Sequence, residues 1–379
     1  MNVVIAPDSF KGSLSAIQAS EIMGKAIKSV DADSQAVLKP MADGGEGTLE
    51  SFLASTDGVR IALTCTGPLG EKIDTTYGII DSNTAVIECA SIAGLVQVPE
   101  DKRNPDFTTT FGIGEAMLDA LDEGCTSIVL GLGGSATNDG GLGMLLALGM
   151  KAWNVNGEEV GPFGKDVQHI TGVSFEAIDK RLSHTDIKVA CDVDNPLCGE
   201  RGATSVYGPQ KGLPTEKIMP YDNALNQYGK AVESALNKQL QNVAGAGAAG
   251  GLGFALLAID GKLVSGAKLL ADTMNVEKEI RDADLVLTGE GRSDEQTLYG
   301  KAPGYIASLA KHYQVPVVLV SGSLDGDLDT LREYFTGCFS IVNKPISLEK
   351  CMEQAEKLLY EQTKQVVHLI RCLENHQRA

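Results

Sequence analysis

Residues 284–294, Asp-Leu-Val-Leu-Thr-Gly-Glu-Gly-Arg-Ser-Asp, join a short apolar run to a loop of glycines and charged side chains. The first five residues have the length and composition of a buried strand. In the loop, Gly289 and Gly291 leave the backbone uncovered, so that a ligand can approach it closely. A strand that runs into such a loop is typical of open α/β sheets, in which ligands bind at the carboxyl ends of the strands.

The same alternation of short strand and helix occurs at both ends of the chain. At the amino-terminal end we expect strands over 2–6 and 36–38, and helices over about 13–29 and 48–54. At the carboxyl-terminal end we expect strands over 284–288, 315–320 and 338–342, and helices over 302–312, 328–335 and 348–373. Strands joined by helical crossovers form parallel sheets, so both ends are expected to build one doubly wound sheet.

Between these ends the pattern changes. β-prone runs over 60–66, 73–80 and 85–90 are separated by turn signals and predict an antiparallel meander. The expected fold is therefore α/β, a doubly wound parallel sheet domain interrupted by a second, distinct α/β domain with mixed or antiparallel strands. The predicted domains are 1–60 plus 272–379, and 61–271 as the insertion.

The composition narrows the classes of partner. Of 379 residues, 50 are acidic and 32 are basic, and the net charge of −18 argues against nucleic acid or an anionic membrane as a partner. Eight cysteines without a CxxC pair indicate reduced thiols, and five histidines without an HxxxH pair argue against a zinc site. The first residues predict a strand rather than a signal peptide, so we expect a cytoplasmic location.

Two further glycine-rich loops carry polar side chains. One is Ala42-Asp43-Gly44-Gly45-Glu46-Gly47-Thr48, and the other covers 131–141, Gly-Leu-Gly-Gly-Ser-Ala-Thr-Asn-Asp-Gly-Gly. Uncovered N–H groups suit a polyanion, and nearby carboxylates suit Mg²⁺, so the loops indicate an enzyme of nucleotide phosphates that lacks a Walker lysine loop. Aspartate is also a common turn and helix-cap residue, and for any single position that structural role is the simpler interpretation.

Two segments match weak forms of the dinucleotide-binding pattern. G-x-G-x-x-A begins at Gly131, and G-x-G-x-x-G covers 245–250. The second follows a polar helical stretch rather than a strand, and the first lacks a ribose-binding acid at the expected distance. We prefer to interpret 131–141 as an anion nest, with Ser135, Thr137 and Asn138 as neutral donors or acceptors.

Two other strand ends carry candidate groups. Lys11 follows the first strand and either neutralises a phosphate or carboxylate or belongs to a solvated capping turn. Asp192 and Asp194 follow a strand over 187–191, where a metal ligand, a base and a substrate contact are all open interpretations. An Asx turn before Pro196 is the structural alternative.

Taken together, these segments resemble the type I glycerate kinase family. The resemblance rests on 8–14, 42–48, 131–141, 190–197, 247–253 and 287–294, which run in family order over nearly the whole chain. It implies an ATP-dependent kinase of D-glycerate that uses Mg²⁺, forms 2-phosphoglycerate and serves organic-acid catabolism. It also implies that the doubly wound domain is flavodoxin-like.

Phosphoryl transfer needs positioning, charge neutralisation and a group that orients or deprotonates the attacking hydroxyl. On this basis we assign hypothetical roles within the resemblance. The residues expected to bind ATP phosphates are Gly133, Gly134, Ser135, Asn138, Gly250 and Gly251. Those expected to bind the substrate are Ser9, Lys11, Asp43, Glu290 and Arg292. Those expected to hold Mg²⁺ are Asp43, Glu46, Asp192 and Asp194. The predicted catalytic residues are Lys11 and Arg292 on the phosphate or carboxylate, Asp192 as the base and Asp294 as the second choice of base.

Three other functions remain open from the sequence. A kinase of another small hydroxy acid is the nearest alternative. An NAD(P)-dependent hydroxy-acid oxidoreductase is supported only by the two weak glycine patterns. A non-catalytic binding protein for small hydroxy acids fits a two-domain chain but not the excess of acidic glycine loops. The oligomeric state cannot be read from the sequence.

Overall fold

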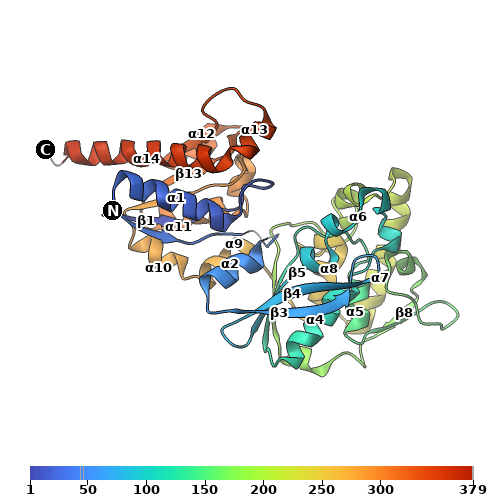
Figure 1. Ribbon diagram of the computed structural model, residues 1–379. Coiled ribbons are helices and arrows are strands. Elements are labelled where there is room, and N and C mark those ends of the chain that lie inside the picture. Colours follow the sequence, from blue (N-terminus) through green and yellow to red (C-terminus); the bar gives the residue numbers. More distant parts are fainter. Residues whose placement is uncertain (43, 46, 378–379) are drawn as a thin grey trace. The chain divides into compact units, whose positions relative to one another are not determined.

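The structure, a computed structural model, describes residues 1–42, 44–45 and 47–377, with side chains described as far as 373. The chain divides into two compact units (Figure 1). Unit 1 is Met1–Asp43, Glu50–Ser55 and Gly266–Ala379, and unit 2 is Gly44–Leu49 and Thr56–Ser265. The sequence-based division differs in giving 44–49 and 56–60 to the first domain and 266–271 to the insertion.

Unit 1 is built on a five-stranded parallel sheet with the order β15-β13-β11-β1-β2. Its strands are β1 (Asn2–Ile5), β2 (Gln35–Leu38), β11 (Leu285–Thr288), β13 (Val317–Ser321) and β15 (Gly337–Ser340). Numbered within the unit, this is the 2-1-3-4-5 order of flavodoxin-like folds. The predicted doubly wound α/β class is therefore confirmed.

Helices cover both faces of this sheet. On one face, α1 (Ala16–Val30) and α14 (Ala355–Gln377) share a core with alternate residues of β1 and β11, such as Val3 and Leu285. The residues between them, such as Val4 and Val286, are also fully buried, because the other face packs against helices such as α11 (Ala302–His312). The smaller elements of unit 1 are α9 (Gly266–Thr273), α10 (Val276–Arg281), β12 (Arg292–Ser293), η7 (Glu295–Leu298), β14 (Ser323–Leu324), α12 (Leu328–Arg332) and α13 (Leu348–Glu353).

The single helix predicted over 348–373 is wrong, because the segment forms two helices, α13 and α14, separated at Gln354. Only α14 presents an apolar stripe to the core, through Leu358, Leu359, Val366 and Val367. Leu348 at the start of α13 is 76% exposed. The residues of α13 would therefore bury no additional apolar surface if they continued α14 along the same axis.

Unit 2 contains a six-stranded mixed sheet with the order β10-β9-β6-β5-β4-β3. Its strands are β3 (Val59–Thr66), β4 (Lys72–Ile80), β5 (Thr84–Glu88), β6 (Ser127–Gly131), β9 (Asp186–Ala190) and β10 (Lys262–Val264). β3, β4 and β5 pair antiparallel, which confirms the predicted meander. β5, β6, β9 and β10 pair parallel, so their carboxyl ends lie along one edge.

The remaining elements of unit 2 surround a large apolar core. They are α3 (Cys89–Ala93), η1 (Leu95–Gln97), η2 (Glu100–Lys102), η3 (Pro105–Phe107), α4 (Phe111–Asp122), α5 (Leu142–Ala147), β7 (Lys151–Trp153), η4 (Gly164–His169), β8 (Gly172–Ser174), η5 (Lys180–His184), α6 (Ala203–Tyr207), η6 (Pro209–Lys211), α7 (Thr215–Leu236) and α8 (Ala248–Ala258). Helix α2 (Thr48–Ser55) belongs to unit 2 in its first two residues and to unit 1 thereafter. No helix in the described part of the chain is both long enough and apolar enough to cross a membrane.

Candidate active site

In unit 1 the predicted residues gather at the carboxyl ends of β1 and β11. These neighbouring strands lie where the strand order changes direction, the point at which open α/β sheets bind ligands. The Asp8 N–H donates to the Gly289 carbonyl at 2.8 Å, which joins the loops that follow the two strands. The structure thus brings the segment with Ser9 and Lys11 next to the segment with Glu290 and Arg292.

Glycine permits this close approach of the loops. A Cβ at Gly291 would lie 3.3 Å from the Lys11 backbone nitrogen, and one at Gly322 would overlap the Gly291 carbonyl oxygen. Gly12, at φ +82°, forms the tight turn in which the Phe10 N–H donates to the Leu14 carbonyl at 2.8 Å. Lys11 lies at the exposed tip of that turn.

The charged groups of 290–294 are engaged within unit 1. Glu290 is buried and accepts from Ser293 Oγ at 3.1 Å, Thr297 Oγ1 at 2.7 Å and Lys301 Nζ at 3.2 Å. Arg292 is exposed and pairs with Asp325 at 2.8 Å. Asp294 caps η7 by accepting from the Gln296 N–H at 2.9 Å. Glu290 therefore organises the loop, and Arg292 is the group in it best placed to reach a ligand.

In unit 2 the predicted residues gather at the carboxyl ends of β6 and β9. The Leu132 N–H donates to the Ala190 carbonyl at 3.3 Å, and the Gly133 N–H donates to the Gly44 carbonyl at 3.1 Å. A Cβ at Gly131 would lie 2.6 Å from that same carbonyl oxygen of Gly44. The three loops can meet only because their contact positions are bare backbone.

The segment 247–251 completes this cluster. Ala249, Gly250 and Gly251 have φ values of 51°, 70° and 91°, so the chain turns sharply before it enters the regular part of α8. The Gly140 N–H donates to the Gly250 carbonyl at 2.9 Å. A Cβ at Gly250 would overlap the Thr137 carbonyl oxygen. The residues predicted to bind ATP phosphates therefore lie together, although the pattern at 245–250 follows turns and not the strand of a dinucleotide-binding unit.

A buried lysine supports the loop that follows β6. Lys211 of η6 is 2% exposed, and its Nζ donates to Ser135 Oγ at 2.8 Å and to the Thr137 carbonyl at 2.6 Å. Burial is the main cause that lowers the pKa of Lys211, to about 8, while Cys89 and Asp139 act in the opposite direction. Sequence reasoning missed this residue, because a lysine between Gly208-Pro209 and Gly212 carries the signature of an exposed turn.

Asp139 fixes the end of the same loop. Its buried carboxylate accepts from the Thr110 N–H and Oγ1 and from the N–H groups of Gly141 and Gly143, at 2.7–3.2 Å. Desolvation raises its pKa, while these hydrogen bonds oppose the shift. Asn138 is also fully buried, and its amide nitrogen donates to Thr204 Oγ1 at 2.9 Å, which joins the loop to α6.

The acidic candidates differ in their surroundings. Asp192 is half-buried directly after β9, whereas Asp194 is exposed and accepts from Arg201 Nη2 at 2.8 Å with both oxygens. The predicted metal ligands Asp43 and Glu46 lie outside the described residues. The residues that are described contain no group of three or more histidine, cysteine or acidic side chains placed to hold a metal ion.

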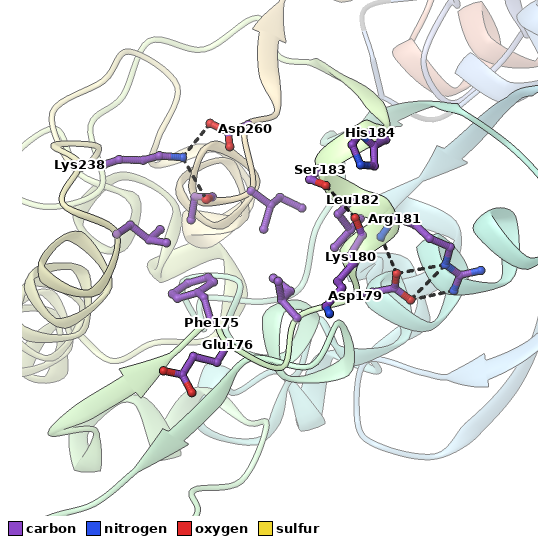
Figure 2. Close-up of a pocket in the computed structure, with 14 residues that line it drawn as sticks. Phe175, Glu176, Asp179, Lys180, Arg181, Leu182, Ser183, His184, Lys238 and Asp260 are labelled. Atoms are coloured by element: carbon purple, nitrogen blue, oxygen red, sulfur yellow. Dashed lines mark hydrogen bonds and ion pairs between the residues drawn. The ribbon is translucent and has the colours of Figure 1, made fainter.

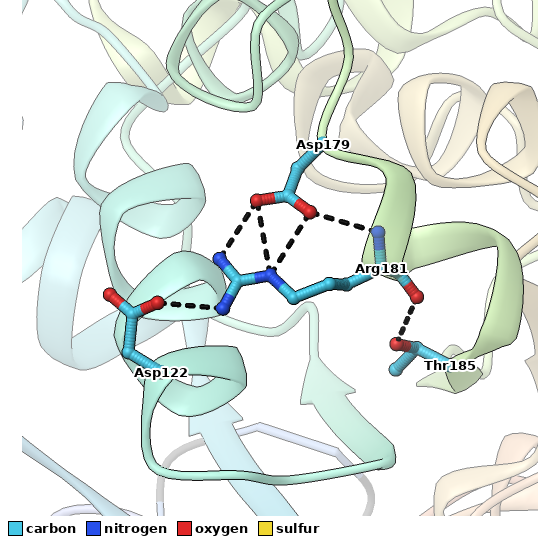
Figure 3. Close-up of polar contacts among 4 residues, drawn as sticks. All are labelled: Asp122, Asp179, Arg181 and Thr185. Carbon is cyan, nitrogen blue, oxygen red and sulfur yellow. Dashed lines mark hydrogen bonds and ion pairs between the residues drawn. The ribbon is translucent and has the colours of Figure 1, made fainter.

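A separate hollow lies at the other end of β9. It has a volume of about 610 Å³ and is lined by residues of 175–184, 236–238 and 258–260 (Figure 2). In its wall, Arg181 donates to both Asp179 and Asp122, as Figure 3 shows, and so joins η5 to the end of α4. The hydrogen bonds from Arg181 to Asp179 lower the pKa of Asp179. None of the predicted site residues in the described chain lines this hollow.

Comparison with known proteins decides the family. The model of the glycerate kinase family matches residues 3–371. The chain belongs to this family. A glycerate kinase of Halalkalibacterium halodurans is 43% identical over 96% of this chain and 97% of its own length. The glycerate 2-kinase of Escherichia coli K12 is 43% identical over 94% of both chains.

A solved structure agrees with this assignment. The crystal structure of a Salmonella typhimurium LT2 protein, assigned as a glycerate kinase 2, is 39% identical and covers 99% of both chains with a TM-score of 0.89. The predicted family, fold class and kinase activity are therefore confirmed. The roles given to single residues remain predictions.

Gly250→Ala is expected to destabilise the protein by about 3 kcal/mol or more, because alanine adds a left-handed strain and overlaps the Thr137 carbonyl. Gly124→Ala is the matched control. Gly124 has φ +87° but nothing within 4 Å of its Cβ, so only the strain of about 1 kcal/mol is expected. Denaturant unfolding of both variants measures the difference, and equal losses would contradict the packing argument.

Lys211→Met is expected to flatten the alkaline pH dependence of stability. Lys211 has a folded pKa of about 8 against 10.5 for the free side chain, so between these values the unfolded chain binds a proton that the folded chain has lost. Stability of the wild type should therefore rise with pH, by about 3 kcal/mol in total for this group. Unfolding free energies at pH 7.5 and 10 measure it, and parallel changes in the two proteins would refute the assignment.

Proposed function

We propose that the protein transfers the γ-phosphoryl group of ATP to the 2-hydroxyl group of D-glycerate, with 2-phosphoglycerate and ADP as products. The observation that carries the proposal is the family match over 3–371. The name of the Escherichia coli relative, glycerate 2-kinase, supports the choice of hydroxyl. The hydroxyl oxygen attacks phosphorus, its proton passes to a base, and the bond to the ADP oxygen breaks.

We assign the ATP phosphates to the glycine cluster of unit 2. Gly133, Gly134 and Ser135 lie in the loop after β6. Gly250 and Gly251 pack against the same loop, at Thr137 and Gly140. Backbone without side chains lets an anion approach N–H groups closely. Asn138 is buried against Thr204, so we expect it to shape the loop rather than to touch phosphate.

We assign the carboxylate and the transferred phosphoryl group to the switch point of unit 1. Lys11 and Arg292 provide exposed positive charge there, and Ser9 adds a hydroxyl. The planar fork of Arg292 suits bidentate binding of the carboxylate, and Lys11 suits a phosphoryl oxygen. Glu290 supports this binding indirectly, because its oxygens are bonded to Ser293, Thr297 and Lys301.

We assign the base to Asp192 and expect Mg²⁺ to neutralise charge on the phosphates when it is bound. Asp192 follows β9 at the same sheet edge as the glycine cluster, whereas Asp294 already caps η7. Asp192 is also a candidate metal ligand, together with Asp43 and Glu46. Asp194 fits either role less well, since both of its oxygens face Arg201. Eight free thiols support a reducing, cytoplasmic location.

The full-length protein with Mg·ATP and D-glycerate is expected to release ADP in a coupled assay and to give one new phosphorus NMR signal, coupled to the proton on carbon two. A phosphate on carbon three would keep the kinase but refute the chosen hydroxyl. Turnover with other small hydroxy acids but not with glycerate would favour the alternative kinase. L-glycerate serves as the control for stereochemistry.

Asp192→Asn is expected to lower kcat by about 10²–10⁴-fold, because the amide cannot accept the hydroxyl proton. Asp260→Asn is the control, since Asp260 is exposed and pairs with Lys238 at the opposite sheet edge. Its kcat should stay within twofold of the wild type. Near-normal kcat in folded Asp192→Asn would show that another group acts as the base.

A further inference from the structure

Burial of the Lys211 ammonium costs unit 2 stability, so its position needs another explanation. A lysine that is 2% exposed normally pairs with a carboxylate, but the two bonds of its Nζ go to a hydroxyl and a backbone carbonyl. Asp139, whose charge acts to raise the pKa of Lys211, directs its oxygens to Thr110, Gly141 and Gly143. The hydrogen bonds of the Lys211 ammonium thus go to Ser135 and Thr137 of the loop after β6.

The bond to Ser135 determines what that side chain can do. A hydroxyl has one hydrogen to donate and two lone pairs that accept. Because the Lys211 ammonium is a donor only, it occupies a lone pair of Ser135 Oγ and leaves the hydroxyl hydrogen for another acceptor. A phosphate oxygen is such an acceptor, and Ser135 lies one residue after the left-handed Gly134.

The backbone on both sides of Ser135 is held firmly. The Leu95 N–H donates to the Gly134 carbonyl and the Ala136 N–H donates to the Ala93 carbonyl, both at 2.8 Å. The second lysine bond, to the Thr137 carbonyl, fixes the next turn. The loop is therefore anchored from α3 on one side and from η6 on the other.

We propose that Lys211 is a positioning residue for the nucleotide: it orients the Ser135 hydroxyl as a donor to a phosphate oxygen and places a positive charge behind the glycine loop. This proposal rests on the proposed function, since it takes the loop after β6 as the ATP phosphate site. Lys211 itself touches no reacting atom.

The groups that face Lys211 do not titrate near pH 8, so a change in ATP binding there reports the loss of the Lys211 proton. Cys89 of α3 is fully buried, its pKa is raised to about 12, and it stays neutral below pH 10. Asp139 is held by four donors, and Ser135 and Thr137 do not titrate. Loss of the Lys211 proton near pH 8 should therefore weaken ATP binding while Mg·ATP itself keeps its charge.

The test measures the Kd of Mg·ATP by calorimetry without glycerate, and kcat and KM with it, for Lys211→Met, Ser135→Ala and the double variant. We expect each single variant to raise Kd and the KM for ATP about tenfold, with a smaller change in kcat. The double variant should be little weaker than Lys211→Met alone, because one residue acts through the other. Lys230→Met, an exposed lysine on α7, is the control and should bind like the wild type.

The outcomes separate the two proposals. A Kd within twofold of the wild type for Lys211→Met, or fully additive losses in the double variant, overturns the role of Lys211. If Lys211→Met does not fold, Ser135→Ala and the rise of the wild-type Kd between pH 7 and 9 test the same claim, and a flat profile refutes it. Wild-type protein that binds Mg·ATP but forms no ADP with D-glycerate refutes the proposed substrate and leaves the role of Lys211 standing.

Discussion

The contact of bare backbone with bare backbone is the constraint on which the site in unit 2 depends. Gly44 lies against Gly131, Gly133 contacts Gly45, and Gly250 fits against the Thr137 carbonyl. No other residue type allows these three segments to approach so closely, because any Cβ would fall on a neighbouring backbone atom. The polar side chains of the loop acquire defined positions only after this packing has formed.

Unit 1 reaches a comparable result through topology. Reversal of strand order at β1 and β11 leaves the ends of two adjacent strands free of a covering crossover. The loops that follow them are joined by the bond between Asp8 and Gly289. Buried Glu290 then ties the second loop to η7 and α11 through Thr297 and Lys301. Lys11 and Arg292 lie exposed on these hydrogen-bonded loops.

Much of this organisation could be predicted from the sequence. A short apolar run such as 284–288 predicts a strand that is buried on both faces of its sheet. The meander over 60–90 is predicted by the turn residues that separate its β-prone runs. The ordered glycine loops identify the family, and within each unit the structure brings the loops of that unit together. Lys211 could not be found in this way, because its role depends on burial by tertiary packing, whereas local sequence describes only a turn. The break at Gln354 was missed for a similar reason, since an amphipathic pattern does not reveal where the core ends.

The sheet order of unit 1 has a consequence for biosynthesis. β1 pairs with β11, which lies about 280 residues later in the chain, while unit 2 is formed entirely by residues between them. During translation, unit 2 can therefore complete its core while β1 still lacks the partner on one of its edges. An unpaired apolar strand is prone to association with other chains. The segment that carries β1 and β2 is therefore expected to need protection from such association until the segment that carries β11 has left the ribosome.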